Sequence, residues 1–136
     1  IVGFPGESDE DFQASCQVAR TAGFSKIHVF PFSGRKGTPA AERTDQVPPA
    51  LKAERVAALS KLGEAIRQDY FESLINERLE VMVESVVEAS TGEAAEWFGT
   101  TCRYAPMRGR GKAAPGELVS VAVTGTDKGI LTGDFA

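Results

Sequence analysis

The chain has 136 residues, of which 42% are hydrophobic and 25% are charged, and its formal net charge at pH 7 is -4. These values are typical of a soluble globular protein and exclude a disordered or collagen-like chain. No stretch approaches the roughly 20 apolar residues of a membrane span, and the first residues lack the features of a signal peptide, so we expect a cytoplasmic protein without a membrane partner. The two cysteines, Cys16 and Cys102, are too few for a disulfide framework, which fits a reducing compartment.

The charges are unevenly distributed along the chain. Residues 1–70 hold nine acids and nine bases, so the whole acidic excess lies in residues 71–136. Within that second half, residues 97–116 hold four bases and no acid. Residues 72–96 are acidic and carry seven glutamates: Glu72, Glu77, Glu80, Glu84, Glu88, Glu93 and Glu96. We therefore expect a basic side and an acidic side in the second half.

The first 32 residues show a strand, helix, strand pattern. The opening IVGF is apolar, as buried parallel strands are, and it leads through a Pro-Gly turn into a helix. Ser8 followed by Asp11 resembles a capping box, and Gly23 marks the end of the helix. A second apolar run, KIHVFPF, follows at once. This order predicts a βαβ unit with parallel strands.

Residues 33–49 are rich in Gly, Pro and charge and show no periodicity, which predicts a long loop. Loops of this length are often functional. From Pro49 onward, apolar residues keep mostly to one stripe and predict a helix of about 20 residues.

From Leu79 the hydrophobic period changes to two, as expected for a half-buried antiparallel strand. Similar short segments follow around residues 95–101, 102–107, 118–124 and 130–135. Five short strands predict a small closed or partly open barrel of the OB type. The fold class is thus α/β followed by all-β, with one domain at residues 1–70 and another at residues 71–136.

The first domain lacks the neighbours that a sheet needs. Two parallel strands and two helices cannot cover both faces of a sheet, and a two-stranded pair is marginal by itself. The chain also starts at Ile1, inside a predicted strand and without an initiator methionine. We therefore expect it to be the carboxyl-terminal piece of a larger protein.

The segments IVGFPGES, HVFPFSGRKGTPA and DQVP, followed by an amphipathic helix and a small barrel, resemble the carboxyl-terminal part of the radical S-adenosylmethionine methylthiotransferases. The barrel segments FGTTCRYAPM and GILTGDF are similar to a TRAM domain, an RNA- or substrate-binding module. The form HVFPFS looks most like the enzymes that methylthiolate C2 of N6-threonylcarbamoyladenosine next to the tRNA anticodon. Isopentenyladenosine and ribosomal-protein enzymes are the alternatives.

The resemblance implies that residues 1–70 form the last two βα units of a partial, TIM-like barrel that binds the cofactor at the carboxyl ends of its strands. Glycine there lets backbone approach a ligand, and the helix start after Gly6 offers N–H groups to a carboxylate or phosphate. We call the residues expected to flank S-adenosylmethionine the cofactor wall: Val2, Gly3, Phe4, Pro5, Phe30, Pro31, Phe32 and Ser33.

The resemblance also implies two 4Fe-4S clusters in the full-length enzyme, each held by three cysteines. Thiolates suit iron and sulfide because they are soft donors. Cys16 and Cys102 match neither cluster motif, so we assign no metal ligand and no catalytic residue to this chain. We expect the chain to be inactive alone.

The expected partner is the tRNA anticodon stem-loop. Arg35 and Lys36 lie in the predicted long loop beside the cofactor wall, and either solvent or the tRNA backbone is their partner. The stretch RGRGK lacks the Ser or Thr of a P-loop and is interpreted as a flexible basic hairpin tip. Cationic groups for phosphate and a ring for base stacking come from five residues of the second half: Arg103, Tyr104, Arg108, Arg110 and Lys112.

Two other interpretations of the barrel remain open. The barrel could be a non-catalytic RNA-binding module that is complete as it stands, or its acidic side could hold a basic protein substrate. His28, the single histidine, alternates with Phe30 and Phe32, so all three face one side of a strand. A packed, hydrogen-bonded histidine is the favoured interpretation, and contact with cofactor or substrate is the alternative.

Overall fold

A computed structural model describes residues 1–88 and 94–135 of the chain. The chain divides into two compact units, Ile1–Arg67 and Gln68–Ala136. The division falls three residues before the limit at residue 70 that we expected from the sequence.

The first helix of unit 1, α1 (Asp9–Ala22), begins and ends where the sequence predicts. Ser8 caps it by accepting a hydrogen bond from the backbone N–H of Asp11, whose carboxylate accepts from the N–H of Ser8 in return. Gly23 ends the helix in the left-handed conformation, with φ 62°. The capping box and the glycine stop are therefore confirmed.

The two predicted parallel strands of unit 1 are reduced to a single bridge between Val2 and Pro31. The N–H of Val2 donates to the carbonyl of Phe30 at 2.9 Å, and the N–H of Phe32 donates to the carbonyl of Val2 at 2.7 Å. The parallel direction is as predicted, but continuous strands over residues 1–4 and 26–32 are not formed. Only two segments pair here, and a two-stranded pair without further neighbours is marginal.

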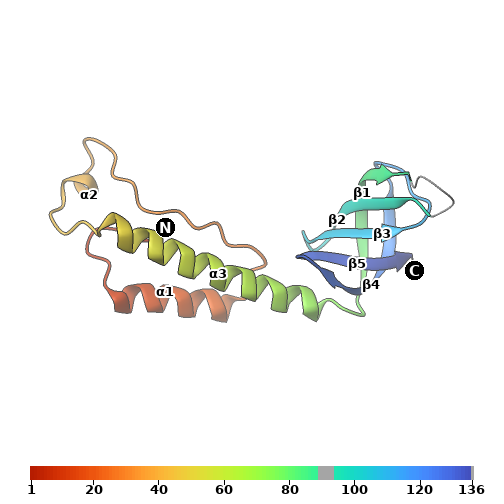
Figure 1. Cartoon of the computed structure of the whole chain (residues 1–136), viewed down its shortest axis with the longest axis horizontal. Helices are drawn as coiled ribbons and strands as arrows, with labels where there is room; N and C mark the ends of the chain where they lie inside the picture. Colours follow the sequence, from red (N-terminus) through yellow and green to blue (C-terminus); the bar gives the residue numbers. More distant parts are fainter. Residues whose placement is uncertain (89–93, 136) are drawn as a thin grey trace. The chain divides into compact units, whose positions relative to one another are not determined.

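Unit 1 also contains the short helix α2 (Pro39–Glu42) within the predicted loop and most of the long helix α3 (Pro49–Ser73). The latter has 25 residues, five more than expected. Figure 1 shows α1 and α3 side by side, and their buried side chains form one cluster with Val2. That cluster consists of Val2, Phe12, Cys16, Ala19, Leu59 and Ile66.

Unit 2 is a closed barrel in which the strands follow the order β1-β2-β3-β5-β4 (Figure 1). The parallel pair is β3 with β5, and the other neighbours are antiparallel. Lys128 and Gly129 join β4 to β5, both with positive φ, as a tight hairpin requires. The strands are β1 (Arg78–Val87), β2 (Glu96–Thr101), β3 (Pro106–Arg110), β4 (Leu118–Asp127) and β5 (Ile130–Phe135).

The third strand begins four residues later than the predicted segment 102–107. Residues 102–105 form a turn instead, and Arg108 and Arg110 belong to a strand rather than to a hairpin tip. The glycines of RGRGK suggested flexibility, but Gly109 pairs with Trp97 of β2 and leaves room for that ring. Glycine inside a strand often marks such a close approach.

The inner face of the barrel is filled by alternating side chains of the five strands. In β1, for example, Leu79, Val81 and Val83 are buried and their neighbours are exposed. Trp97, Met107, Val121 and Leu131 complete the centre of this core. Among the described residues, no helix combines the length and apolar character that crossing a membrane requires.

We predict that Gly109→Ala destabilises the barrel by about 1–3 kcal/mol, because a Cβ there would collide with the Trp97 ring and the backbone of Gly133. Gly125→Ala is the matched control, because its Cβ would meet only the hydroxyl of Thr132, at 3.3 Å. Urea unfolding followed by the fluorescence of Trp97, the single tryptophan, measures both. Equal midpoints for the two variants would contradict this account of the close approach.

Candidate cofactor wall and nucleic-acid interface

The structure brings the two halves of the cofactor wall together. Residues 2–5 lie beside residues 30–33 through the bridge of Val2 to Pro31. The rings of Phe4 and Phe32 meet edge to face, with centroids 5.1 Å apart. Phe4 is 48% exposed and Phe30 is 60% exposed, so the wall offers aromatic side chains to whatever covers it.

The space beside the two glycines of the first turn is already filled by the chain itself. A Cβ on Gly3 would lie 2.5 Å from Cγ of Lys52, and one on Gly6 would lie 2.6 Å from a carboxylate oxygen of Asp45. Both glycines also have positive φ, 74° and 81°. The two glycines therefore make room for side chains and for a tight turn. Their approach to a ligand stays a prediction.

The start of α1, where we expected N–H groups to be offered to an anion, is capped and acidic. The capping box uses the N–H groups of Ser8 and Asp11, and the first turn carries three acids, Asp9, Glu10 and Asp11. The hydrogen bond from the backbone N–H of Ser8 lowers the pKa of Asp11, which keeps this carboxylate charged. An incoming carboxylate or phosphate would meet negative charge here.

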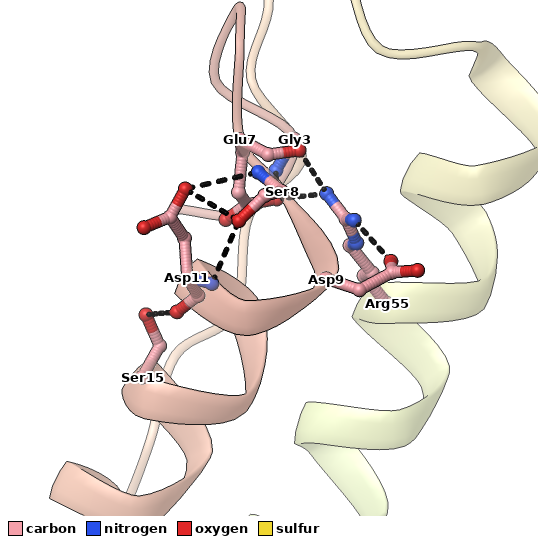
Figure 2. A network of polar contacts seen from close by, with 7 residues as sticks. All are labelled: Gly3, Glu7, Ser8, Asp9, Asp11, Ser15 and Arg55. Atoms are coloured by element: carbon pink, nitrogen blue, oxygen red, sulfur yellow. Dashed lines mark hydrogen bonds and ion pairs between the residues drawn. The ribbon is translucent and has the colours of Figure 1, made fainter.

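Arg55 of α3 was not identified from the sequence. Its side chain binds the turn that leads into α1 (Figure 2). Its side chain is only 3% exposed. Its guanidinium donates to the carboxylate of Glu7 at 2.6 Å, to the carbonyl of Glu7 at 3.1 Å and to the carboxylate of Asp9 at 2.6 Å. These hydrogen bonds raise the pKa of Arg55 above its ordinary value, and the bond to Asp9 has the largest effect. The guanidinium is therefore always charged.

Lys52, one turn before Arg55, was missed as well. Its ammonium donates to the carbonyl of Phe32 at 3.3 Å and lies 5.3 Å from the centre of the Phe32 ring. Since its stem also packs against Gly3, Lys52 touches both halves of the cofactor wall. A pattern search could not find either cation, because their partners lie 20 to 48 residues away in the sequence.

The remaining candidates of unit 1 lie at the surface. His28 is exposed, so the favoured interpretation of a packed histidine is wrong. Arg35 and Lys36 are exposed in the loop before α2, as the sequence suggested. The carbonyl of Arg35 accepts a hydrogen bond from the hydroxyl of Thr38 at 2.7 Å, which fixes the turn that carries both cations.

In unit 2, the turn between β2 and β3 presents Arg103 and Tyr104 to solvent. Tyr104 is 88% exposed and has a positive φ of 57°, which is uncommon for a large side chain. The turn is held by Thr101, which is 3% exposed. Its hydroxyl accepts from the N–H groups of Arg103, at 3.2 Å, and Ala105, at 3.1 Å.

The three other basic candidates of the barrel differ in their surroundings. Arg108 is half-buried and forms ion pairs with Asp127 and, at 3.8 Å, with Glu96. Its charge is therefore largely compensated within the barrel. Arg110 is exposed, and Lys112 is exposed as well, so both retain their side chains for an external partner.

One depression on the barrel is lined by apolar and acidic side chains. The exposed side chains of Met82, Leu118 and Tyr104 line it together with Glu80 and Glu84. Two glutamates of the predicted acidic side, Glu80 and Glu84, are thus clustered in this depression. Glu93, another member of that side, lies outside the described residues.

The described part of the chain contains no group of three or more His, Cys, Asp or Glu side chains arranged to hold a metal ion. Cys16 is buried on α1, and Cys102 is exposed on the turn after β2, in the other unit. Neither cysteine has the companion thiolates that an iron–sulfur cluster needs. The cofactor wall has aromatic rings and backbone groups, which fit an organic ligand rather than a metal.

No family model matches the chain. The chain is 40% identical over 132 residues to a tRNA-2-methylthio-N(6)-dimethylallyladenosine synthase of Mycolicibacterium vanbaalenii, covering 92% of this chain and 26% of the relative. It is 37% identical over 124 residues to a threonylcarbamoyladenosine tRNA methylthiotransferase of Bacillus subtilis, covering 90% and 27%. A ribosomal protein uS12 methylthiotransferase of Anaeromyxobacter is 36% identical over 130 residues, covering 91% and 27%.

The names of all three relatives refer to a methylthio group. The chain spans about a quarter of the length of these relatives, and each match covers at least 90% of the chain. The similarity therefore extends over both the cofactor wall and the barrel. At the level of the family, this similarity agrees with the resemblance drawn from the sequence motifs. It does not distinguish between dimethylallyladenosine, threonylcarbamoyladenosine and ribosomal protein as substrates.

We predict that Thr101→Val destabilises the barrel by about 1–3 kcal/mol, because the buried N–H of Ala105 and the N–H of Arg103 lose their acceptor while the volume is kept. Thr100→Val is the control: its hydroxyl bonds the exposed Glu84, and we expect a change of about 0.5 kcal/mol or less. Urea unfolding followed by Trp97 fluorescence compares the two. A smaller loss for Thr101→Val than for Thr100→Val would overturn the role of the buried hydroxyl.

Proposed function

We propose that the chain is the carboxyl-terminal part of a radical S-adenosylmethionine methylthiotransferase. The observation that carries the proposal is the 36–40% identity to methylthio-transferring relatives over nearly the whole chain, across both units. The closed five-stranded barrel supports it, because a small barrel with exposed cations and an exposed ring suits a TRAM-type substrate-binding module.

In this proposal unit 1 supplies the end of a partial βα barrel, and residues 2–5 and 30–33 border S-adenosylmethionine. The cofactor carries the radical chemistry when it is bound to a 4Fe-4S cluster whose ligands lie elsewhere in the full-length protein. The chain's own contribution is to bind and orient the organic cofactor, and we assign no catalytic residue to it. The proposed location is the cytoplasm, where tRNA substrates are found.

The proposed substrate is an adenosine derivative in the tRNA anticodon stem-loop. The motif HVFPFS favours N6-threonylcarbamoyladenosine, with transfer to its C2. The name of the relative from Mycolicibacterium vanbaalenii favours a dimethylallyladenosine substrate and makes this the second candidate. A basic protein substrate is the third, since the acidic and apolar depression of the barrel has the complementary charge.

The full-length protein, purified without oxygen and supplied with S-adenosylmethionine, a reductant and a sulfide source, tests the proposal. We expect unmodified host tRNA to gain a methylthio group on one adenosine derivative, identified by mass spectrometry of the nucleosides. The mass of the product separates the two adenosine substrates. Absence of methylthio product on tRNA and on ribosomal protein would refute the proposed function, as would the absence of a CxxxCxxC motif upstream in the gene.

We predict that exposed basic and aromatic side chains of the barrel contact the RNA. Arg103, Arg110 and Lys112 each meet about one phosphate, so replacing all three by Gln reduces the slope of log affinity against log salt by about 2. Tyr104→Ala weakens tRNA binding by about 1–3 kcal/mol, as the loss of one stacked base does. Arg108 is left out because its ion pairs already compensate its charge.

The control is Lys128→Gln, which removes an exposed cation on the turn between β4 and β5. This turn lies outside residues 97–116, which hold the other basic candidates of the barrel. Filter binding of tRNA to the full-length protein between low and moderate salt measures each slope. If the triple variant and the Lys128→Gln variant give the same slope, Arg103, Arg110 and Lys112 do not bind RNA.

A further inference from the structure

Arg55 is the one charged side chain among the described residues that is almost fully buried, with 3% exposure. It lies on α3, whereas its partners lie at the turn that leads into α1. Withdrawing a guanidinium from water is costly unless every partner is in place. Such a group ties the positions of its partners to one another.

The connection from Arg55 to the cofactor wall runs through one carboxylate oxygen (Figure 2). Oε2 of Glu7 accepts from Arg55 at 2.6 Å and from the backbone N–H of Gly3 at 2.6 Å. The side chain of Glu7 is only 10% exposed, so water hardly competes for this oxygen. The position of the Gly3 peptide group is therefore set by the position of the Arg55 guanidinium.

Three further contacts limit the movement of this pair. Arg55 also bonds the carbonyl of Glu7 and the carboxylate of Asp9, and its guanidinium carbon lies 5.5 Å from the centre of the Phe12 ring. A planar guanidinium offers five N–H donors in a fixed geometry, whereas an ammonium offers three that rotate freely. Arg55 thus holds the segment from Gly3 to Asp9 through Glu7 at one end and directly through Asp9 at the other.

We propose that Arg55, acting through Glu7, is a positioning device that holds residues 3–5 of the cofactor wall in the geometry that binds S-adenosylmethionine. Arg55 does not touch the cofactor and is a positioning residue. The inference rests on the proposed function and deepens it, since it names a pair of residues outside the cofactor wall itself. Lys52 assists from the same helix, because it contacts Gly3 and the carbonyl of Phe32.

The test uses the full-length protein with Glu7→Gln, Arg55→Lys and Arg55→Met. The amide introduced by Glu7→Gln still offers an oxygen to the N–H of Gly3 but carries no charge for Arg55. We expect the KM for S-adenosylmethionine and the Kd for S-adenosylhomocysteine, the latter from calorimetry, to rise about tenfold or more, since small misplacements of a binding group have effects of this size. The Kd for tRNA stays unchanged, because the barrel is not altered.

The matched control is Arg20→Met, which removes an exposed guanidinium at the end of α1. It leaves both cofactor constants unchanged. Arg55→Lys keeps the charge without the fork, and we expect it to weaken cofactor binding less than Arg55→Met does. Where Arg55→Met fails to fold, Glu7→Gln decides.

The results separate this inference from the proposed function. A wild-type protein that neither binds S-adenosylmethionine nor forms methylthio product removes both. An active wild type whose Glu7→Gln and Arg55→Lys variants melt at lower temperature but keep normal cofactor constants removes this inference alone, because the pair then only stabilises the fold.

Discussion

The need of every strand edge for a hydrogen-bonding partner governs both units of the chain. In the barrel, β1 pairs with both β2 and β4, so the sheet closes and no edge remains open among the described strands. In unit 1 the same requirement is met only at the bridge of Val2 to Pro31. The strand-like sequence of unit 2 therefore forms regular strands. The apolar segments of unit 1 remain largely irregular, although their apolar pattern is equally strong.

Since the sheet of unit 1 is so limited, long-range side-chain contacts fix its turns. The buried cluster around Phe12 and Leu59 holds α1 against α3, but hydrophobic packing has no direction and cannot set the position of a peptide group. Hydrogen bonds from Arg55 and Lys52 do so, because they have a defined length and angle. The backbone of the cofactor wall therefore depends on α3 as well as on its own strand pairing.

Features that depend on neighbours in the sequence were predictable, and features that depend on distant partners were not. The capping box at Ser8, the glycine stop at Gly23 and the period-two pattern of β1 need only a few adjacent residues, and the structure confirms them. The buried role of Arg55 depends on a partner 48 residues away. Gly109 was misinterpreted for the same reason, because the Trp97 ring that requires it lies on another strand.

The acidic barrel remains compatible with RNA because local charge matters more to a polyanion than the sum over the protein. Arg108 illustrates the distinction between a basic sequence and a basic surface. Its guanidinium reaches Asp127 at the end of β4 and Glu96 at the start of β2, so it joins strands and offers little net charge to solvent. Arg103, Arg110 and Lys112 keep their charges exposed. The proposed phosphate contacts therefore involve those three side chains, whereas Arg108 supports the pairing of the strands through its ion pairs.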